Sequence, residues 1–157
     1  MKIKLLAIGK TDDKNLIQLI DLYQKRLQHY IKFELEIIPD IKNVKNLSES
    51  QQKEKEGALI LSKLQATDQL VLLDDKGKQY TSIEFSNFLQ KKMNSGIKQL
   101  VLVIGGPYGF SDAVYQKASG KLSLSKMTFS HQMIRLFIVE QIYRGFTILR
   151  NEPYHHE

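Results

Sequence analysis

Three short segments of this chain are almost continuously apolar, and they restrict the possible folds more than any other feature. They are residues 3–8, 70–73 and 100–104. A strand with only one buried face alternates apolar and polar residues, whereas a strand covered on both faces reads as an unbroken apolar run. The chain is therefore expected to build a sheet that is buried on both sides.

The stretches between these segments have helical periodicity. From residue 15 to about residue 30, large apolar side chains recur at spacings of three and four, which is one face of a helix. Two capping boxes, Ser48 with Gln51 and Thr81 with Glu84, predict two further helix starts. Ser111 can cap a short helix, and Ser130 can cap a last helix that runs to about residue 149.

Three shorter features complete the predicted order of elements. Residues 33–37 alternate apolar and acidic side chains, which is typical of a strand at a sheet edge. Residues 74–77 (DDKG) are expected to form a turn, and residues 121–124 a short fifth strand. Strands that alternate with helices predict a single α/β domain over residues 1–157, with a mostly parallel sheet and helices on both faces.

Composition narrows the functional classes. The chain has no cysteine, which excludes disulfides and thiolate chemistry, and its net charge of +6 favours polyanionic partners, nucleic acid first. No apolar run approaches the roughly 20 residues that span a bilayer. The start of the chain is too brief for a secretory signal, so we expect a cytoplasmic protein. The four histidines do not have metal-ligand spacing, so no metal site is expected.

Ligands of parallel sheets bind outside the carboxyl ends of the strands, so the turns at these ends are the candidate site. Residues 105–109 (GGPYG) follow the most apolar strand. They match neither a dinucleotide fingerprint nor a Walker loop, and their glycines indicate either a close approach to a ligand or simply a tight turn. Residues 122–133 (LSLSKMTFSHQM) are rich in hydroxyls, and such a loop can wrap a partly apolar cofactor such as an adenosyl group.

Three of the four arginines, Arg135, Arg144 and Arg150, lie in the last predicted helix or just beyond it. Guanidinium groups suit phosphate oxygens, although a solvated helix face has the same pattern. The chain then ends with two imidazoles and a phenol in residues 152–157 (EPYHHE), a tail that is either frayed or crosses into the site of a neighbouring subunit.

Several segments together resemble the RlmH family of the SPOUT superfamily, which are ribosomal large subunit pseudouridine methyltransferases. They are residues 2–10 (KIKLLAIGK), 53–57 (KEKEG), 100–109 (LVLVIGGPYG), 122–135 (LSLSKMTFSHQMIR), 140–146 (EQIYRGF) and 153–155 (PYH). The resemblance covers the whole chain. It implies a C-terminal trefoil knot, which is an exception to the rule that chains do not knot. It also implies a homodimer, the cofactor S-adenosyl-L-methionine, and methylation at N3 of a pseudouridine in 23S rRNA of the assembled ribosome.

The family's cofactor contacts fall on three of the bends considered above. Carried over by motif position, they are Leu73, Gly105, Leu124, Ser125, Lys126, Met127, Thr128 and Phe129.

For the chemistry, our hypothesis assigns His155 as the proton acceptor and Tyr154 as a positioning group. Arg135 and Arg144 are assigned to phosphate or to the developing anion, and His131 to contact with either ligand. Relatives often have proline where Ser130 stands, and a cation where His156 stands.

Two other functions remain open at this point. One is a related SPOUT enzyme that modifies another RNA, such as tRNA, or a ribose oxygen. The other is a noncatalytic RNA- or nucleotide-binding module on the same scaffold, because a fold by itself does not determine activity.

Overall fold

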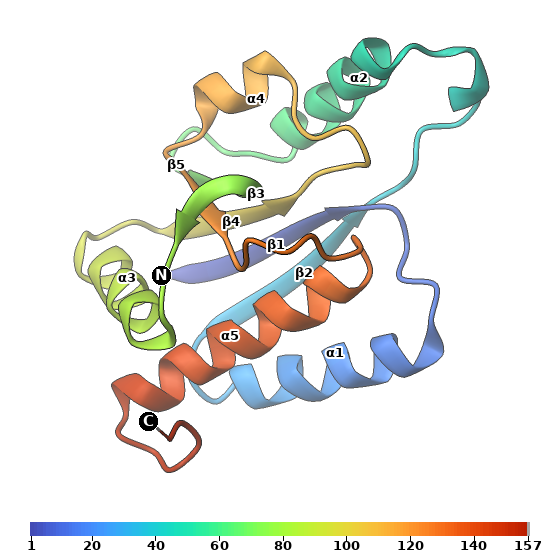
Figure 1. The fold of residues 1–157 in the computed structure, drawn as a ribbon. Helices are drawn as coiled ribbons and strands as arrows, with labels where there is room; N and C mark the ends of the chain where they lie inside the picture. The colour runs from blue at the N-terminus through green and yellow to red at the C-terminus, as the bar shows by residue number, and fades with distance from the viewer. Residues whose placement is uncertain (157) are drawn as a thin grey trace.

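The computed structural model describes residues 1–156, which form one five-stranded sheet with helices on both faces (Figure 1). The strands are β1 (Lys2–Ile8), β2 (Lys32–Ile38), β3 (Gln69–Gln79), β4 (Gln99–Ile104) and β5 (Gly120–Ser123). The helices are α1 (Lys14–Leu27), α2 (Glu49–Ser62), α3 (Ser82–Asn94), α4 (Asp112–Lys117) and α5 (Met133–Leu149), with a 3-10 turn η1 (Val44–Asn46). The strand order is β2-β1-β4-β3-β5 and every pair of neighbours is parallel. The predicted α/β class is confirmed.

The sheet separates two apolar layers. On one face Leu27 of α1, Leu89 of α3 and Ile142 of α5 pack against the sheet, and on the other Ile60 of α2 and Val114 of α4 do so. Figure 1 shows α1, α3 and α5 below the sheet and α2 and α4 above it. All six residues of β4 are buried, which explains their unbroken apolar run.

The alternating segment is the edge strand, as predicted. β2 pairs only with β1, and its acidic side chains face lysines of the neighbouring elements. Lys4 Nζ lies 2.7 Å from Glu36 Oε2, and Lys63 Nζ lies 2.8 Å from Glu36 Oε1. The hydrogen bond from Lys4 is the main cause that lowers the pKa of Glu36, and the bond from Lys63 adds to it.

The turn predicted at residues 74–77 is wrong. β3 continues through these residues to Gln79, with a register shift against β5 between Leu73 and Lys78. Asp74 Oδ1 accepts a hydrogen bond of 2.8 Å from the Lys76 amide, so the polar residues that suggested a turn form a bulge inside a strand. The bulge carries Asp74 and Asp75 out of the sheet toward the carboxyl ends of the strands.

The helix starts follow their caps. Both capping boxes are present, with Ser48 and Thr81 as the N-cap residues of α2 and α3. Ser130 Oγ accepts a 3.1 Å hydrogen bond from the Met133 amide, so the predicted cap is formed although the regular helix begins at Met133. Ser111 stands at the N-cap of α4, but its hydroxyl makes no cap bond. Within residues 1–156 no helix is both long and apolar enough to cross a bilayer.

The central position of β4 makes a stability prediction. Leu102 is 0% exposed between the two layers, so Leu102→Ala removes packing on a strand with neighbours on both sides. We expect it to lower the free energy of unfolding by about 2–5 kcal/mol. Leu59→Ala, at a site 38% exposed on α2, is the matched control and should cost about 1 kcal/mol or less. Urea denaturation of both variants measures this, and equal losses would contradict the placement of the core.

Candidate functional site

A cavity of about 420 Å³ lies at the carboxyl ends of β3, β4 and β5, within the size range of small-molecule sites. Three bends form its wall: residues 73–76 after the regular part of β3, residues 104–110 after β4, and residues 122–131 after β5. The candidate site was expected at these strand ends, and all three segments line one cavity, although the first belongs to β3 and is not the predicted turn.

The glycines of the loop after β4 allow close packing behind the cavity wall. A Cβ on Gly105 would lie 3.0 Å from the Phe110 ring, and a Cβ on Gly106 would overlap the carboxyl group of Glu56. Both glycines line the cavity. At these two glycines the close approach is to protein side chains, and approach to a ligand stays a prediction. Gly109 has the positive φ of a tight turn (82°).

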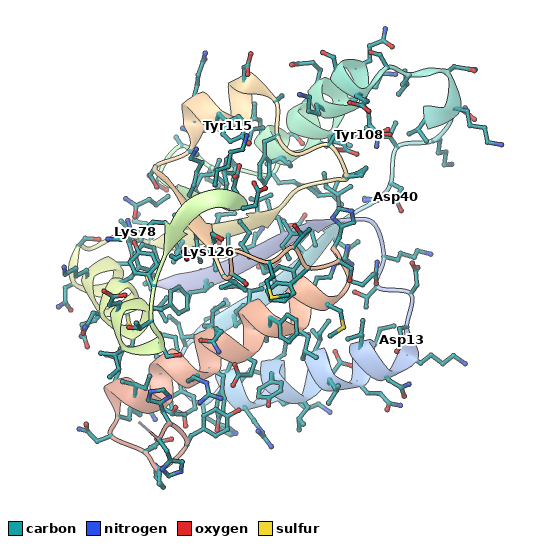
Figure 2. All side chains as sticks on the ribbon, viewed as in Figure 1. Asp13, Asp40, Lys78, Tyr108, Tyr115 and Lys126 are labelled. Atoms are coloured by element: carbon teal, nitrogen blue, oxygen red, sulfur yellow. The ribbon has the colours of Figure 1, made fainter. Side chains whose placement is uncertain are left out.

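A hydroxyl–carboxylate pair spans the mouth between β3 and α4. Tyr115 donates a 2.6 Å hydrogen bond to Asp74 Oδ2. Burial pushes the pKa of Asp74 upward, but this bond, the bond from the Lys76 amide and the charge of Lys121 outweigh it, so the pKa lies below its usual value. Burial and the same bond raise the pKa of Tyr115 to about 12, so the phenol remains a donor at neutral pH. Figure 2 shows Tyr115 and Lys126 on opposite sides of the extended end of β3.

The loop after β5 is held by its own hydroxyls. Ser123 Oγ donates to the Ser125 carbonyl at 2.8 Å, and Ser125 Oγ accepts from the Met127 amide at 2.9 Å. The Phe129 ring packs 4.8 Å from that of Phe137. Of the predicted cofactor residues, the cavity is lined by Leu73, Gly105, Leu124, Ser125, Met127, Thr128 and Phe129, together with His131. Lys126 is exposed and does not line it.

Arg135 is not available to a phosphate, which corrects its predicted role. The side chain is 1% exposed. Its guanidinium donates to the carbonyls of Ile8 (2.8 Å) and Gly9 (2.9 Å) and to Thr11 Oγ1 (2.9 Å), and Nε donates to the His131 carbonyl (3.0 Å). Arg135 therefore joins the end of β1 to the start of α5.

The predicted catalytic residues form a separate cluster against α5. Tyr154 donates to Glu140 Oε1 at 3.0 Å and lies 3.2 Å from the Tyr23 hydroxyl. Arg144 Nη2 lies 2.7 Å from Glu140 Oε1, and Nη1 lies 3.3 Å from His155 Nδ1. Burial raises the pKa of Tyr154, and its bonds to Tyr23 and Glu140 add to this. Of the described tail residues, 152–156, none lines the cavity of the same chain.

Sequence reasoning did not place several residues at the site. Asp74 and Tyr115 were read as turn and helix residues. Glu56 lies in residues 53–57, which carry part of the family resemblance, but no role was assigned to it. Only the structure shows that Glu56 lies against Gly106, which is 50 residues away in the sequence. Among residues 1–156 no group of three or more His, Asp or Glu side chains could hold a metal ion.

Comparison with known proteins decides the family. A model of the family described as predicted SPOUT methyltransferase matches residues 1–155. The chain belongs to the SPOUT methyltransferase family. Membership requires a methyl donor, and the cavity at the carboxyl ends of the strands has the size and the mixed apolar and polar wall to hold one.

Individual relatives agree with this assignment. Ribosomal RNA large subunit methyltransferase H of Flavobacterium johnsoniae is 76% identical, and the proteins of the same name from Flavobacterium psychrophilum and Parabacteroides distasonis are 74% and 68% identical. Each alignment covers 100% of both chains. The structure of a probable methylase family protein from Haemophilus influenzae has a TM-score of 0.52 at 11% identity, covering 99% of this chain and 70% of its own, which supports the SPOUT fold.

The buried arginine gives a second stability prediction. Arg135→Met keeps an apolar stem of similar length but leaves the carbonyls of Ile8 and Gly9 without their donor. We expect the free energy of unfolding to fall by about 2–4 kcal/mol. Arg150→Met is the control, because Arg150 is exposed. Its side chain makes a 3.3 Å hydrogen bond to the His29 carbonyl and lies 4.4 Å from the centroid of the Tyr30 ring, so it has no buried carbonyl to leave unsatisfied. Denaturant titration that shows equal stability for Arg135→Met and the parent would contradict this structural role.

Proposed function

We propose that this chain is an S-adenosyl-L-methionine-dependent methyltransferase that modifies N3 of a pseudouridine in 23S rRNA of the assembled ribosome. The observation that carries the proposal is the convergence of three bends on one cavity in a SPOUT chain. Full-length relatives at 74–76% identity carry the name ribosomal RNA large subunit methyltransferase H. A single SPOUT domain over residues 1–157 with a trefoil knot remains part of this proposal.

The residues of the cavity fit the proposed cofactor. Leu73 and Leu124 offer apolar surface, and Ser125 and Thr128 offer hydroxyls. At Gly105 the backbone itself lines the cavity, and a larger residue at this position would contact the Phe110 ring. Lys126 would contribute through its backbone or from the rim, since its side chain does not line the cavity. When bound, S-adenosyl-L-methionine supplies a methyl group that is already activated by a sulfonium, so neither a metal nor a covalent enzyme intermediate is needed.

The remaining task of the protein is to hold the acceptor and take its proton. N3 of pseudouridine is an imide N–H, which is a poor nucleophile until that proton leaves. Tyr154 keeps its proton because its pKa is raised, so it suits a donor that positions the base. We assign the role of proton acceptor to His155, either directly or through a water, and Arg144, whose Nη1 lies 3.3 Å from His155 Nδ1, to the anion that forms.

The position of the tail supports a homodimer as part of the proposal. Tyr154 and His155 are held against Glu140 and Arg144 in the middle of α5, away from the cavity of their own chain. We propose that in the dimer the tail of one subunit completes the site of the other.

Because Arg135 is buried, we assign the contacts to rRNA phosphate to lysines near the cavity instead. Lys76, Lys78, Lys121 and Lys126 are exposed, and within residues 1–156 none of them lies within ion-pair distance of a carboxylate. Lys76 and His131 both line the cavity. Action on ribosomes places the protein in the cytoplasm.

A labelling experiment tests the activity. Methyl-labelled cofactor is incubated with the protein and with ribosomes from cells that lack the enzyme, and the nucleosides are then separated. We expect label in N3-methylpseudouridine from 23S rRNA, and none with Gly105→Val, whose side chain must displace Phe110 or enter the cavity. Label in tRNA or at a ribose would favour a related SPOUT activity, and no cofactor binding in a thermal-shift titration would favour a noncatalytic module.

Mixing two inactive variants tests the shared site. In a mixed dimer, Gly105→Val supplies an intact tail and His155→Ala an intact cavity, so one complete site forms. Random assortment of equal amounts should restore roughly a quarter of the wild-type activity. His155→Ala alone should bind cofactor normally, which calorimetry measures. Absence of any recovery after the subunits have exchanged would contradict the crossing of the tail.

A further inference from the structure

Glu56 is a buried carboxyl group that the proposed reaction does not use. The residue lies on α2, is 3% exposed, and sits on the face of the helix that covers the sheet. Oε1 accepts a 2.9 Å hydrogen bond from Gln52, whereas Oε2 has no hydrogen-bond partner among the described residues. A buried carboxylate oxygen without a donor is costly, so its retention calls for an explanation.

The carboxyl group lies directly behind the wall of the cavity. A side chain at Gly106 would overlap both carboxyl oxygens, so Glu56 rests against the backbone of that glycine. Gly106 itself lines the cavity. The backbone of Gly106 therefore lies between the Glu56 carboxyl group and whatever occupies the cavity. The protein around the carboxyl group screens its charge far less than water would.

The charges that face Glu56 come from two other segments. Asp40 lies after β2 and His131 lies before α5, and the Asp40 carboxylate opposes ionisation of Glu56 whereas a positive His131 favours it. Burial is the largest influence, and it raises the pKa of Glu56. A positive charge in the cavity would act in the opposite direction and favour the ionised carboxylate.

We propose that Glu56 selects the positively charged sulfonium cofactor over its neutral thioether product by charge attraction through Gly106. The inference rests on the proposed function, because it takes S-adenosyl-L-methionine as the occupant of the cavity. The cofactor and S-adenosylhomocysteine share their adenosine, ammonium and carboxylate groups and differ by one methyl group and one positive charge. A charge behind the wall therefore distinguishes them without any contact, and it favours release of the product after transfer.

The proposal has a defined dependence on pH. Binding of the sulfonium lowers the pKa of Glu56, so binding releases a proton when Glu56 is partly protonated in the free protein. Affinity for the cofactor then rises with pH as Glu56 ionises, whereas affinity for S-adenosylhomocysteine does not follow it. The ratio of the two affinities isolates the effect of the charge.

Calorimetry of the full chain with both compounds, over a series of pH values from the ordinary pKa of a glutamate up to pH 8, tests the inference. In the parent protein the preference for the sulfonium should grow as Glu56 ionises and then stay constant. In Glu56→Gln, which keeps the shape of the side chain, the preference should be about tenfold smaller at pH 8 and flat with pH. Glu54→Gln, an exposed carboxylate on the same helix, is the matched control and should behave like the parent.

A second measurement keeps the inference testable if Glu56→Gln does not fold. Binding to His131→Gln is measured in buffers of different ionisation enthalpy, and this substitution removes the imidazole that faces Glu56. At pH values at which Glu56 titrates, proton release with the sulfonium and none with the thioether is expected. Equal loss of both affinities in Glu56→Gln, an unchanged preference, or no proton release at any pH of the series would overturn the proposal. Failure of the parent protein to bind the cofactor at all would instead refute the proposed function.

Discussion

Arg135 connects the first strand to the last helix, and the cavity depends on this connection. Its guanidinium bonds to the carbonyls that end β1, and its Nε bonds to the carbonyl of His131, where the cavity loop ends. The loop after β5 is thereby fixed at both ends, by β5 and by β1 through α5. A buried charge is tolerated only when its hydrogen bonds are made, and removal of one partner leaves the others unsatisfied. The position of the loop after β5 and the stability of the carboxyl end of β1 are consequently linked through the Arg135 side chain.

Much of the arrangement could be predicted because burial leaves a periodic trace. The unbroken apolar run of β4 reflects cover on both faces, and the alternation of β2 reflects its edge position. The rule that ligands bind at the carboxyl ends of parallel strands then placed the bends after β3, β4 and β5 at one site. The resemblance to a known family supplied the cofactor and the substrate, which periodicity does not contain.

Hydrophobic patterns could not show the partners of buried charges. Arg135 and Glu56 are 1% and 3% exposed, yet charged residues are expected at the surface. The clustering of arginines near the end of the chain suggested phosphate binding, whereas Arg135 binds backbone carbonyls more than 120 residues away. The bulge of β3 was missed for a similar reason. Asp74 to Gly77 have the composition of a turn, and only the pairing of Lys78 and Gln79 with β5 makes them part of a strand.

The geometry of α5 explains why a chain of this length would share its site between two copies. Ile134 lines the cavity, and Arg144 in the tail cluster follows it by ten residues, which is about 15 Å along a helix. To reach its own cavity, the tail would have to give up the bonds of Tyr154 to Glu140 and Tyr23. In the proposed twofold dimer, each tail would reach the other cavity without breaking these bonds, and one contact surface would complete both sites.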